Sequence, residues 1–164
     1  MKLKDKRILV TGGAGFIGSH LVDRLTEEEP ASLVVVDSYF LGRDENLAEA
    51  RMAYPELKLY RMDASNLAAM LQLVLKEKIE VVFDLAVVPL PTSLDFPTWT
   101  IETNIGIAST FCELARRGYI KTLIHCSSSE AYGSAIQIPM NENHPLMPYT
   151  PYAASKAACD HIVL

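Results

Sequence analysis

The stretch TGGAGFIG, residues 11–18, follows an apolar segment, RILVT at residues 7–11, and precedes apolar residues at helical spacing. Its glycines Gly12, Gly15 and Gly18 recur at every third position. Glycine permits a tight turn and a close approach of the backbone to a ligand, and the N-terminus of the next helix offers free N–H groups and a positive dipole. A strand, a glycine-rich turn and a helix in this order predict a binding site for a pyrophosphate.

Strand and helix patterns alternate along the rest of the chain. We expect strands at residues 7–11, 32–37, 57–62, 80–86 and 121–127. We expect helices at residues 17–28, 65–78, 98–117 and from Pro151 onward, with Ser65 as the cap of the second helix and loops at 88–97 and 139–151. The second strand, SLVVVD, has almost no polar alternation, which is typical of a strand covered on both faces. The sequence therefore predicts an α/β fold of one domain, residues 1–164, with a Rossmann-type doubly wound parallel sheet in a three-layer αβα arrangement.

Composition argues against several classes of protein. About half of the 164 residues are hydrophobic, which is enough for a packed core. The formal net charge of −5 offers no basic surface for nucleic acid. Three widely spaced cysteines argue against a disulfide framework, and the histidines lack the spacing of metal ligands, so we expect no metal. Without a long apolar run or the apolar core of a signal peptide, we expect a cytoplasmic protein that does not enter a membrane.

Acidic residues end the second and third predicted strands. Asp37 comes 19 residues after Gly18, where a carboxylate would bind the adenosine ribose hydroxyls. It would repel a 2′-phosphate, so the sequence favours NAD over NADP, although the nearby Arg43 leaves the opposite preference open. Asp63 has two open roles, a contact with the adenine amino group or a cap for the following helix.

A second set of motifs occupies the last third of the chain. SSSEAYG lies at residues 127–133, and Tyr152 and Lys156 form a Y-x-x-x-K pattern. Together with TGGAGFIG, these motifs resemble the short-chain dehydrogenase/reductase superfamily, in the extended branch that contains nucleotide-sugar epimerases, 4,6-dehydratases and decarboxylases. The resemblance covers essentially the whole chain. It implies NAD as the cofactor and a nucleotide-linked sugar as the substrate, modified through a 4-keto intermediate.

The resemblance also implies a role for four side chains. Tyr152 would take a proton from a sugar hydroxyl as hydride leaves the same carbon, and Lys156, on the same face of the helix, would favour the phenolate and hold the nicotinamide ribose. Ser128 would hold the substrate oxygen by a hydrogen bond. Glu130 occupies a position that carries an acid in dehydratases and decarboxylases, and its alternative is an ordinary glutamate of a surface loop.

We therefore expect catalysis by Ser128, Glu130, Tyr152 and Lys156. We expect the cofactor to be held by Gly12, Gly15, Phe16, Ile17, Gly18, Asp37, Asp63, Ala86, Asn104, Tyr152 and Lys156. One departure from the branch lies at the end of the fourth strand, where Asp84 stands in place of a frequent histidine. A non-catalytic NAD-binding or redox-sensing module with the same fold remains the alternative function.

Two expectations concern the whole protein. Members of this branch are much longer, so we expect this chain to be the N-terminal portion, without the substrate domain and without turnover of its own. The helices at 98–117 and from Tyr152 onward resemble a pair that forms a dimer interface in the superfamily, and we expect a homodimer. The apolar residues expected on that face are Ile101, Ile105, Ala108, Phe111, Leu114, Ala153, Ala157 and Ile162.

Overall fold

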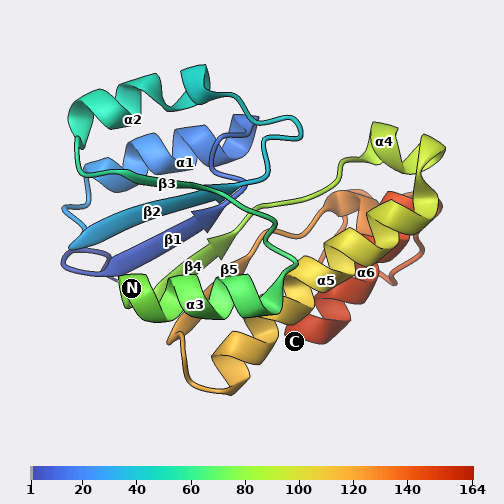
Figure 1. Cartoon of the computed structure of the whole chain (residues 1–164). Coiled ribbons are helices and arrows are strands. Elements are labelled where there is room, and N and C mark those ends of the chain that lie inside the picture. Colours follow the sequence, from blue (N-terminus) through green and yellow to red (C-terminus); the bar gives the residue numbers. More distant parts are fainter. Residues whose placement is uncertain (1) are drawn as a thin grey trace.

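A single parallel sheet forms the centre of the protein in the computed structural model, which describes residues 2–164 (Figure 1). Its strands are β1 (Arg7–Thr11), β2 (Ser32–Asp37), β3 (Lys58–Arg61), β4 (Val81–Asp84) and β5 (Thr122–His125), in the order β3-β2-β1-β4-β5. Because β1 pairs with β2 on one side and with β4 on the other, the chain winds outward from β1 in both directions. The predicted doubly wound fold is confirmed, and each of the five predicted strands is present.

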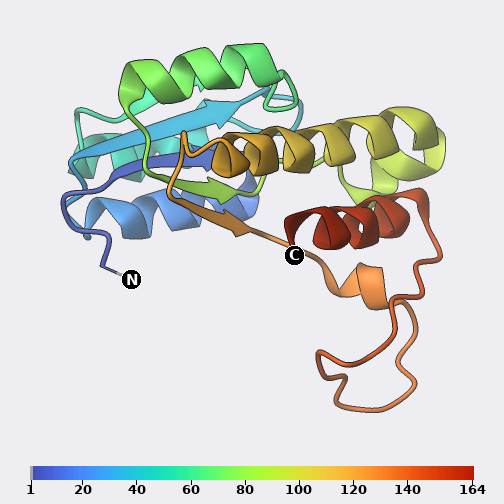
Figure 2. The same ribbon diagram turned by 90° about the horizontal axis from the view of Figure 1, so that it is seen from below.

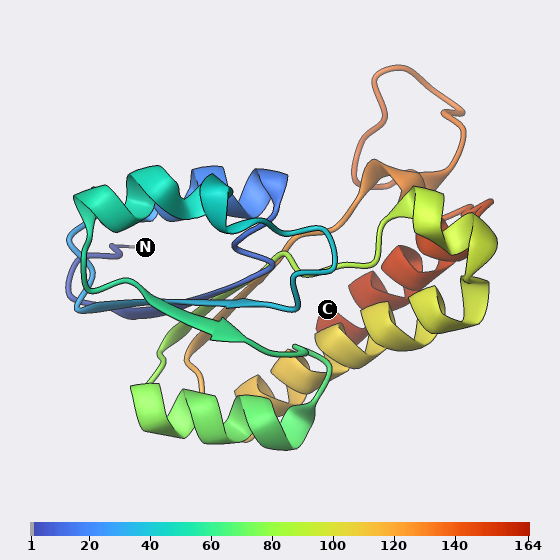
Figure 3. The same ribbon diagram turned by 45° about the horizontal axis from the view of Figure 1, so that its top comes forward.

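Helices cover both faces of the sheet and make the expected three layers. Helices α1 (Phe16–Thr26) and α2 (Ala48–Ala53) lie on one face, and α3 (Leu67–Glu77) and α5 (Pro97–Arg116) on the other (Figure 3). Helix α4 (Leu90–Asp95) precedes α5, and α6 (Pro151–Val163) packs along α5. Two 3₁₀ turns are η1 (Asp44–Leu47) and η2 (Ser129–Tyr132). The segment between η2 and α6 extends away from the sheet (Figure 2).

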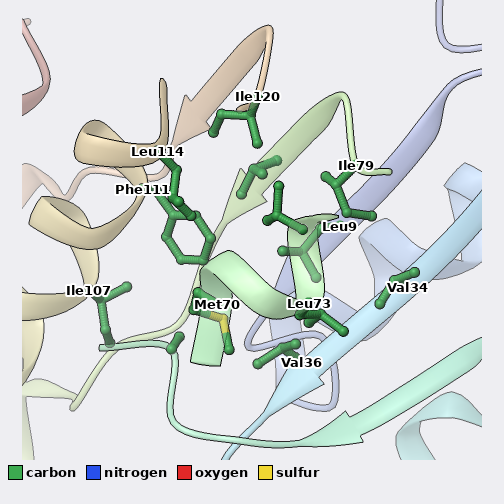
Figure 4. Packing of buried hydrophobic residues seen from close by; sticks show 13 residues of the cluster. Leu9, Val34, Val36, Met70, Leu73, Ile79, Ile107, Phe111, Leu114 and Ile120 are labelled. Carbon is green, nitrogen blue, oxygen red and sulfur yellow. The ribbon is translucent and has the colours of Figure 1, made fainter. Parts of the chain in front are cut away.

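Alternate residues of the strands supply two apolar cores, since successive side chains of a strand point to opposite faces. Leu9 and Val34 pack with Met70 of α3 and Phe111 of α5 on one face (Figure 4). The core of the other face comes from neighbouring strand positions together with α1, η1 and α2, and includes Ile8, Val10, Val22, Leu25, Val35, Leu47 and Ala50. Burial of both strand faces explains the unbroken apolar run of β2.

The structure corrects the sequence predictions in three connecting segments. Residues 88–97, predicted as a loop, contain α4, whose proline lies in the first turn, where a missing N–H costs no helical hydrogen bond. The helical residues 44–53 were not predicted. Ser65 does not cap α3; the Asn66 side chain does, by accepting a hydrogen bond from the Ala69 N–H at 3.0 Å.

Five of the eight apolar residues expected on the association face are not available for it. Ala108, Phe111 and Leu114 of α5 are buried within the chain, as are Ala153 and Ala157 of α6. Phe111 and Leu114 belong to the core on one face of the sheet, and α5 and α6 pack against each other. Ile101 and Ile105 are partly buried and Ile162 is exposed, and the homodimer stays a prediction. Two further findings concern residues 2–164: they contain no helix long and apolar enough to cross a membrane, and no group of three or more side chains able to hold a metal ion.

Candidate functional site

A cavity of about 480 Å³ opens at the carboxyl ends of the strands. Its wall is formed by the glycine-rich turn after β1, the loops after β2, β3 and β4, the segment after β5, and parts of α5 and α6. This edge lies where the strand order reverses between β1 and β4, the place at which open parallel sheets bind ligands. Its volume is in the range of small-molecule and cofactor sites. Among the predicted cofactor-binding residues, all except Asn104 line this cavity.

The glycine-rich turn forms one end of the cavity. Gly12 has a positive φ of 64° and its N–H donates to the Val36 carbonyl at 2.8 Å. At Gly18, a Cβ would lie 2.1 Å from the Gly12 carbonyl oxygen, so only glycine lets α1 approach the turn this closely. No side chain caps the start of α1, where Gly15 is the N-cap and the exposed Phe16 and Ile17 begin the helix. Uncapped N–H groups beside a turn without side chains fit a pyrophosphate.

Asp37 joins the end of β2 to this turn. Its Oδ2 accepts a hydrogen bond from the Ala14 N–H at 2.9 Å, and its Oδ1 accepts from the Tyr39 N–H at 2.8 Å. The residue is only 7% exposed, and what remains accessible faces the cavity. A carboxylate oxygen can accept two hydrogen bonds, so each oxygen of Asp37 can still accept one from a ligand hydroxyl. Arg43 is exposed and lies outside the cavity wall.

Asp63 and Ala86 line the cavity from the loops after β3 and β4. The Asp63 Oδ1 accepts hydrogen bonds from the backbone and the hydroxyl of Ser65, at 2.9 and 2.8 Å, and holds a tight turn. Since Asn66 caps α3, the alternative role of Asp63 as the helix cap is wrong. The Ala86 N–H donates to the Thr11 Oγ1 at 3.1 Å, which fixes the backbone of the loop after β4.

Asn104 lies outside the cavity and is buried between α5, α6 and the loop after β4. Its Oδ1 accepts from the Val88 N–H at 2.8 Å, and its Nδ2 donates to the Val88 carbonyl at 3.2 Å and to the Ser155 hydroxyl at 2.9 Å. These bonds occupy both polar atoms of the amide. The side chain therefore holds the cavity wall in place rather than lining it.

Tyr152 and Lys156 face the cavity from the first turns of α6. The helix begins after Thr150, whose hydroxyl accepts from the Ala153 N–H at 3.0 Å, and a spacing of four residues places both side chains on one face. Lys156 is 4% exposed, and its Nζ donates to the Cys126 carbonyl at 2.6 Å. The structure thus brings this pair together with the glycine-rich turn around one cavity.

Glu130 lies in the neighbouring turn η2 and Ser128 is its N-cap residue, and both are outside the cavity wall. The Ser128 Oγ accepts a hydrogen bond from the Glu130 N–H at 3.2 Å, and Glu130 is exposed. Their place in the wall is taken by Cys126 and Ser127, which precede η2. Turn η2 packs against α6, so both residues are near the helix that carries Tyr152.

Two aromatic residues that the sequence analysis did not single out also line the cavity. Phe40 follows β2 and Trp99 lies at the start of α5, and their rings meet edge to face with centroids 5.1 Å apart. Edge-to-face contact is a favourable geometry for aromatic rings. The contact joins the two sides of the cavity, and the sequence gives no signal for a pair 59 positions apart.

Comparisons with known proteins show which family the chain resembles. A family model described as GDP-mannose 4,6 dehydratase matches residues 9–164. The chain is 36% identical over 141 residues to UDP-glucuronic acid decarboxylase 6 of Arabidopsis thaliana, and the matched region covers 85% of this chain and 38% of that protein. It is also 36% identical over 154 residues to the UDP-glucose 4-epimerase of Mycolicibacterium smegmatis, and this match covers 93% of the chain and 48% of the epimerase. The chain thus spans less than half the length of these relatives.

Solved structures show the same fold. The UDP-N-acetylglucosamine 4-epimerase from Methanobrevibacter ruminantium M1, in complex with UDP-N-acetylmuramic acid, has a TM-score of 0.85 and 34% identity, over 96% of this chain and 49% of that chain. The dTDP-glucose 4,6-dehydratase from Streptomyces venezuelae, solved with NAD bound, has a TM-score of 0.85 and 32% identity, over 94% of this chain and 49% of that chain.

Proposed function

The chain belongs to the extended short-chain dehydrogenase/reductases that act on nucleotide sugars, since it matches the family described as GDP-mannose 4,6 dehydratase. From this premise we propose that it binds NAD in the cavity and takes part in the modification of a nucleotide-linked sugar. The observation that supports the proposal is the composition of one cavity wall. A glycine-rich turn, an acidic strand end and the Tyr152–Lys156 pair meet there. A plain strand–helix turn has no need of all three.

The first part of the proposal concerns cofactor binding. The uncapped N–H groups at the start of α1 would receive the pyrophosphate, because they combine free donors with the positive end of the helix dipole. The remaining lone pairs of Asp37 would accept from the adenosine ribose hydroxyls. A 2′-phosphate beside this carboxylate would be repelled, so NAD is preferred over NADP.

The second part concerns the reaction. NAD, when bound, accepts a hydride from the sugar carbon that is oxidised. The Tyr152 side chain, as the phenolate, would take the proton of the sugar hydroxyl on that carbon, which leaves a 4-keto sugar and a neutral tyrosine. The Lys156 ammonium beside it would favour the phenolate and hold the nicotinamide ribose. Ser128 would hold the sugar oxygen. Glu130 would remove the C5 proton that the new ketone acidifies if the reaction is a dehydration, or would assist a later step if it is an epimerisation or a decarboxylation.

The experiment that tests this proposal replaces Tyr152 by phenylalanine. In a longer version that joins residues 2–164 to the remaining C-terminal residues of the Mycolicibacterium smegmatis epimerase, Tyr152→Phe should lower turnover of UDP-sugars by about a hundred- to ten-thousandfold, because a positioned proton acceptor is lost. The affinity for NADH should stay nearly unchanged, since the hydroxyl acts only in proton transfer. Steady-state kinetics and calorimetry measure the two effects. Full activity of the variant would contradict the mechanism.

A non-catalytic NAD-binding module is the second candidate. It is favoured by the position of Ser128, whose hydroxyl is engaged by the Glu130 backbone outside the cavity wall. The kinetic comparison separates the two functions. A module of this kind binds NADH and shows no turnover on UDP-, dTDP- or GDP-sugars even in the longer version. An enzyme shows turnover in the longer version and loses it in the Tyr152→Phe variant.

A further inference from the structure

A line of three buried polar side chains runs behind the cavity and ends at Lys156. Asp84 closes β4 and His125 closes β5, and the two residues are partners in the register of the parallel pair. The Asp84 Oδ2 lies 2.8 Å from the His125 Nδ1, and the His125 Nε2 lies 3.2 Å from the Lys156 Nζ. The Asp84 side chain is 1% exposed and that of His125 7%, so water does not separate these groups.

The hydrogen bonds of this line run in one direction. Thr11 Oγ1 accepts from two backbone N–H groups, those of Leu85 and Ala86, so its own hydrogen is free to go to the Asp84 Oδ1, 2.7 Å away. The second oxygen, Oδ2, accepts from the imidazole, which places the histidine proton on Nδ1. The Nε2 lone pair then faces the ammonium, which donates.

The opposite tautomer would break the line at both ends. A proton on Nε2 would point at an ammonium that has only donors, and the bare Nδ1 would face a carboxylate that only accepts. The Asp84 carboxylate therefore selects the form of His125 that accepts from Lys156. With the Cys126 carbonyl and the imidazole each taking one hydrogen, the ammonium keeps one N–H for a ligand in the cavity.

We propose that Asp84 and His125 are positioning residues that hold the Lys156 ammonium at the cavity wall with one N–H free for the ribose hydroxyls of a nicotinamide nucleotide. The inference rests on the proposed function, because it assumes that Lys156 meets this ligand. A side chain with four rotatable bonds is fixed before the ligand arrives, so less freedom is lost on binding. Asp84 stands where the branch often has a histidine, and its role here would be to orient His125 on the neighbouring strand.

Two substitutions of His125 form a matched test. In His125→Gln the amide reaches the place of Nε2 and offers Lys156 an oxygen, whereas in His125→Asn the shorter amide reaches only the place of Nδ1, near Asp84. We expect the asparagine variant to bind NADH roughly tenfold more weakly and the glutamine variant to stay within about threefold of the parent chain, as the loss or retention of one hydrogen bond to a charged group predicts. Thermal unfolding of both variants checks that each is folded. Equal NADH affinity in the two variants would overturn the proposal.

A second measurement does not depend on the cofactor. The ¹⁵N spectrum of the His125 ring in the chain without NADH should show a protonated Nδ1 and a bare Nε2, and Asp84→Ala should remove this preference. A ring protonated on Nε2 in the parent chain would overturn the proposal whatever the affinities are. If the parent chain does not bind NADH, the proposed function fails, while the spectrum still decides whether Asp84 and His125 present an acceptor to Lys156.

Discussion

The Asp37 carboxylate accepts from the Ala14 and Tyr39 backbone N–H groups and faces the cavity with its remaining lone pairs. Asp37→Asn removes its negative charge and turns one oxygen into a donor. We expect the affinity for NADH to fall by about tenfold, the effect of losing a hydrogen bond to a charged group, and the preference against NADPH to shrink. Calorimetric titration with both nucleotides measures the ratio.

The exposed Asp95, which lies outside the cavity wall, provides the control for this prediction. Asp95→Asn changes the net charge of the chain by the same amount and should leave both affinities unchanged. If the parent chain binds NADPH as tightly as NADH, the role given to Asp37 is wrong.

Motif spacing correctly predicts which residues line the cavity when the motif itself defines their place. It fails for side chains whose hydrogen-bond partners come from distant segments. The glycines, Asp37 and the Tyr152–Lys156 pair line the cavity as the sequence indicates. The amide of Asn104, in contrast, is used by Val88 and Ser155, which no local pattern connects to it. The catalytic and cofactor roles stay predictions, because each needs a ligand contact.

At the scale of elements, helix α1 depends on the absence of a side chain at Gly18. A Cβ there would lie 2.1 Å from the Gly12 carbonyl oxygen and 2.8 Å from the Gly13 Cα, and these are backbone atoms that move only if the turn opens. Gly18→Ala should therefore destabilise the fold by about 2 kcal/mol or more, as overpacking does, and lower the midpoint of thermal unfolding by roughly 5 °C. Circular dichroism measures the shift.

Gly106→Ala on α5 is the matched control. A Cβ at this position would meet only the Ser65 Cβ at 3.2 Å, and alanine favours a helix over glycine by about 1 kcal/mol. We expect its stability to lie within about 1 kcal/mol of the parent chain. A Gly18→Ala variant as stable as Gly106→Ala would show that α1 does not need this close contact.

Glu77 links α3 to β3. Its side chain is 5% exposed and accepts from the Lys58 Nζ at 2.6 Å and the Tyr60 hydroxyl at 2.7 Å. These hydrogen bonds, that of Lys58 first, lower the pKa of Glu77 below the ordinary 4.5. A carboxylate whose pKa is lower in the folded state adds stability above the unfolded value and loses it as the pH falls.

The pH dependence of stability follows from this sign. Glu77→Gln should be less stable than the parent at pH 7, and the difference between the two proteins should shrink as the pH falls below about 4.5. Urea unfolding at a series of pH values measures it. Glu56→Gln, at an exposed position, should follow the parent throughout. A Glu77→Gln difference that stays constant down to pH 3 would refute the linkage.

Elements with strong apolar patterns were predictable, and short helices set by tertiary contacts were not. The central strands β1 and β2 are nearly fully buried, and this burial on both faces imposes an apolar run that is visible in the sequence. The edge strand β3 has exposed ends and a weaker pattern. Helix α2 and turn η1 span few residues and are held by the buried Leu47 and Ala50, which pack on α1 and the sheet. Too few positions lie in such segments for a helical period to appear.

At the scale of the whole molecule, the cavity belongs to both halves of the sheet. The turn after β1 and the loops after β2 and β3 form one side, and the loop after β4, the segment after β5, α5 and α6 form the other. The doubly wound topology, which the alternating pattern predicts, brings these segments to one edge. The Phe40–Trp99 contact between the two sides depends on loop conformations and was not predictable.

Trp99 allows the binding of NADH to be measured separately from turnover. Trp99 is the single tryptophan of the chain and lines the cavity, so its emission should be quenched by energy transfer when NADH binds. We expect the 164-residue chain to show this signal and to convert no UDP-, dTDP- or GDP-sugar. Its relatives have more than half of their length outside the matched region, and Ser128 and Glu130 lie outside the cavity wall. The Mycolicibacterium smegmatis epimerase, assayed beside it with UDP-glucose, is the positive control. Turnover by the chain alone would show that residues 2–164 already contain a complete sugar site, whereas an unquenched Trp99 at saturating NADH would place the nucleotide elsewhere.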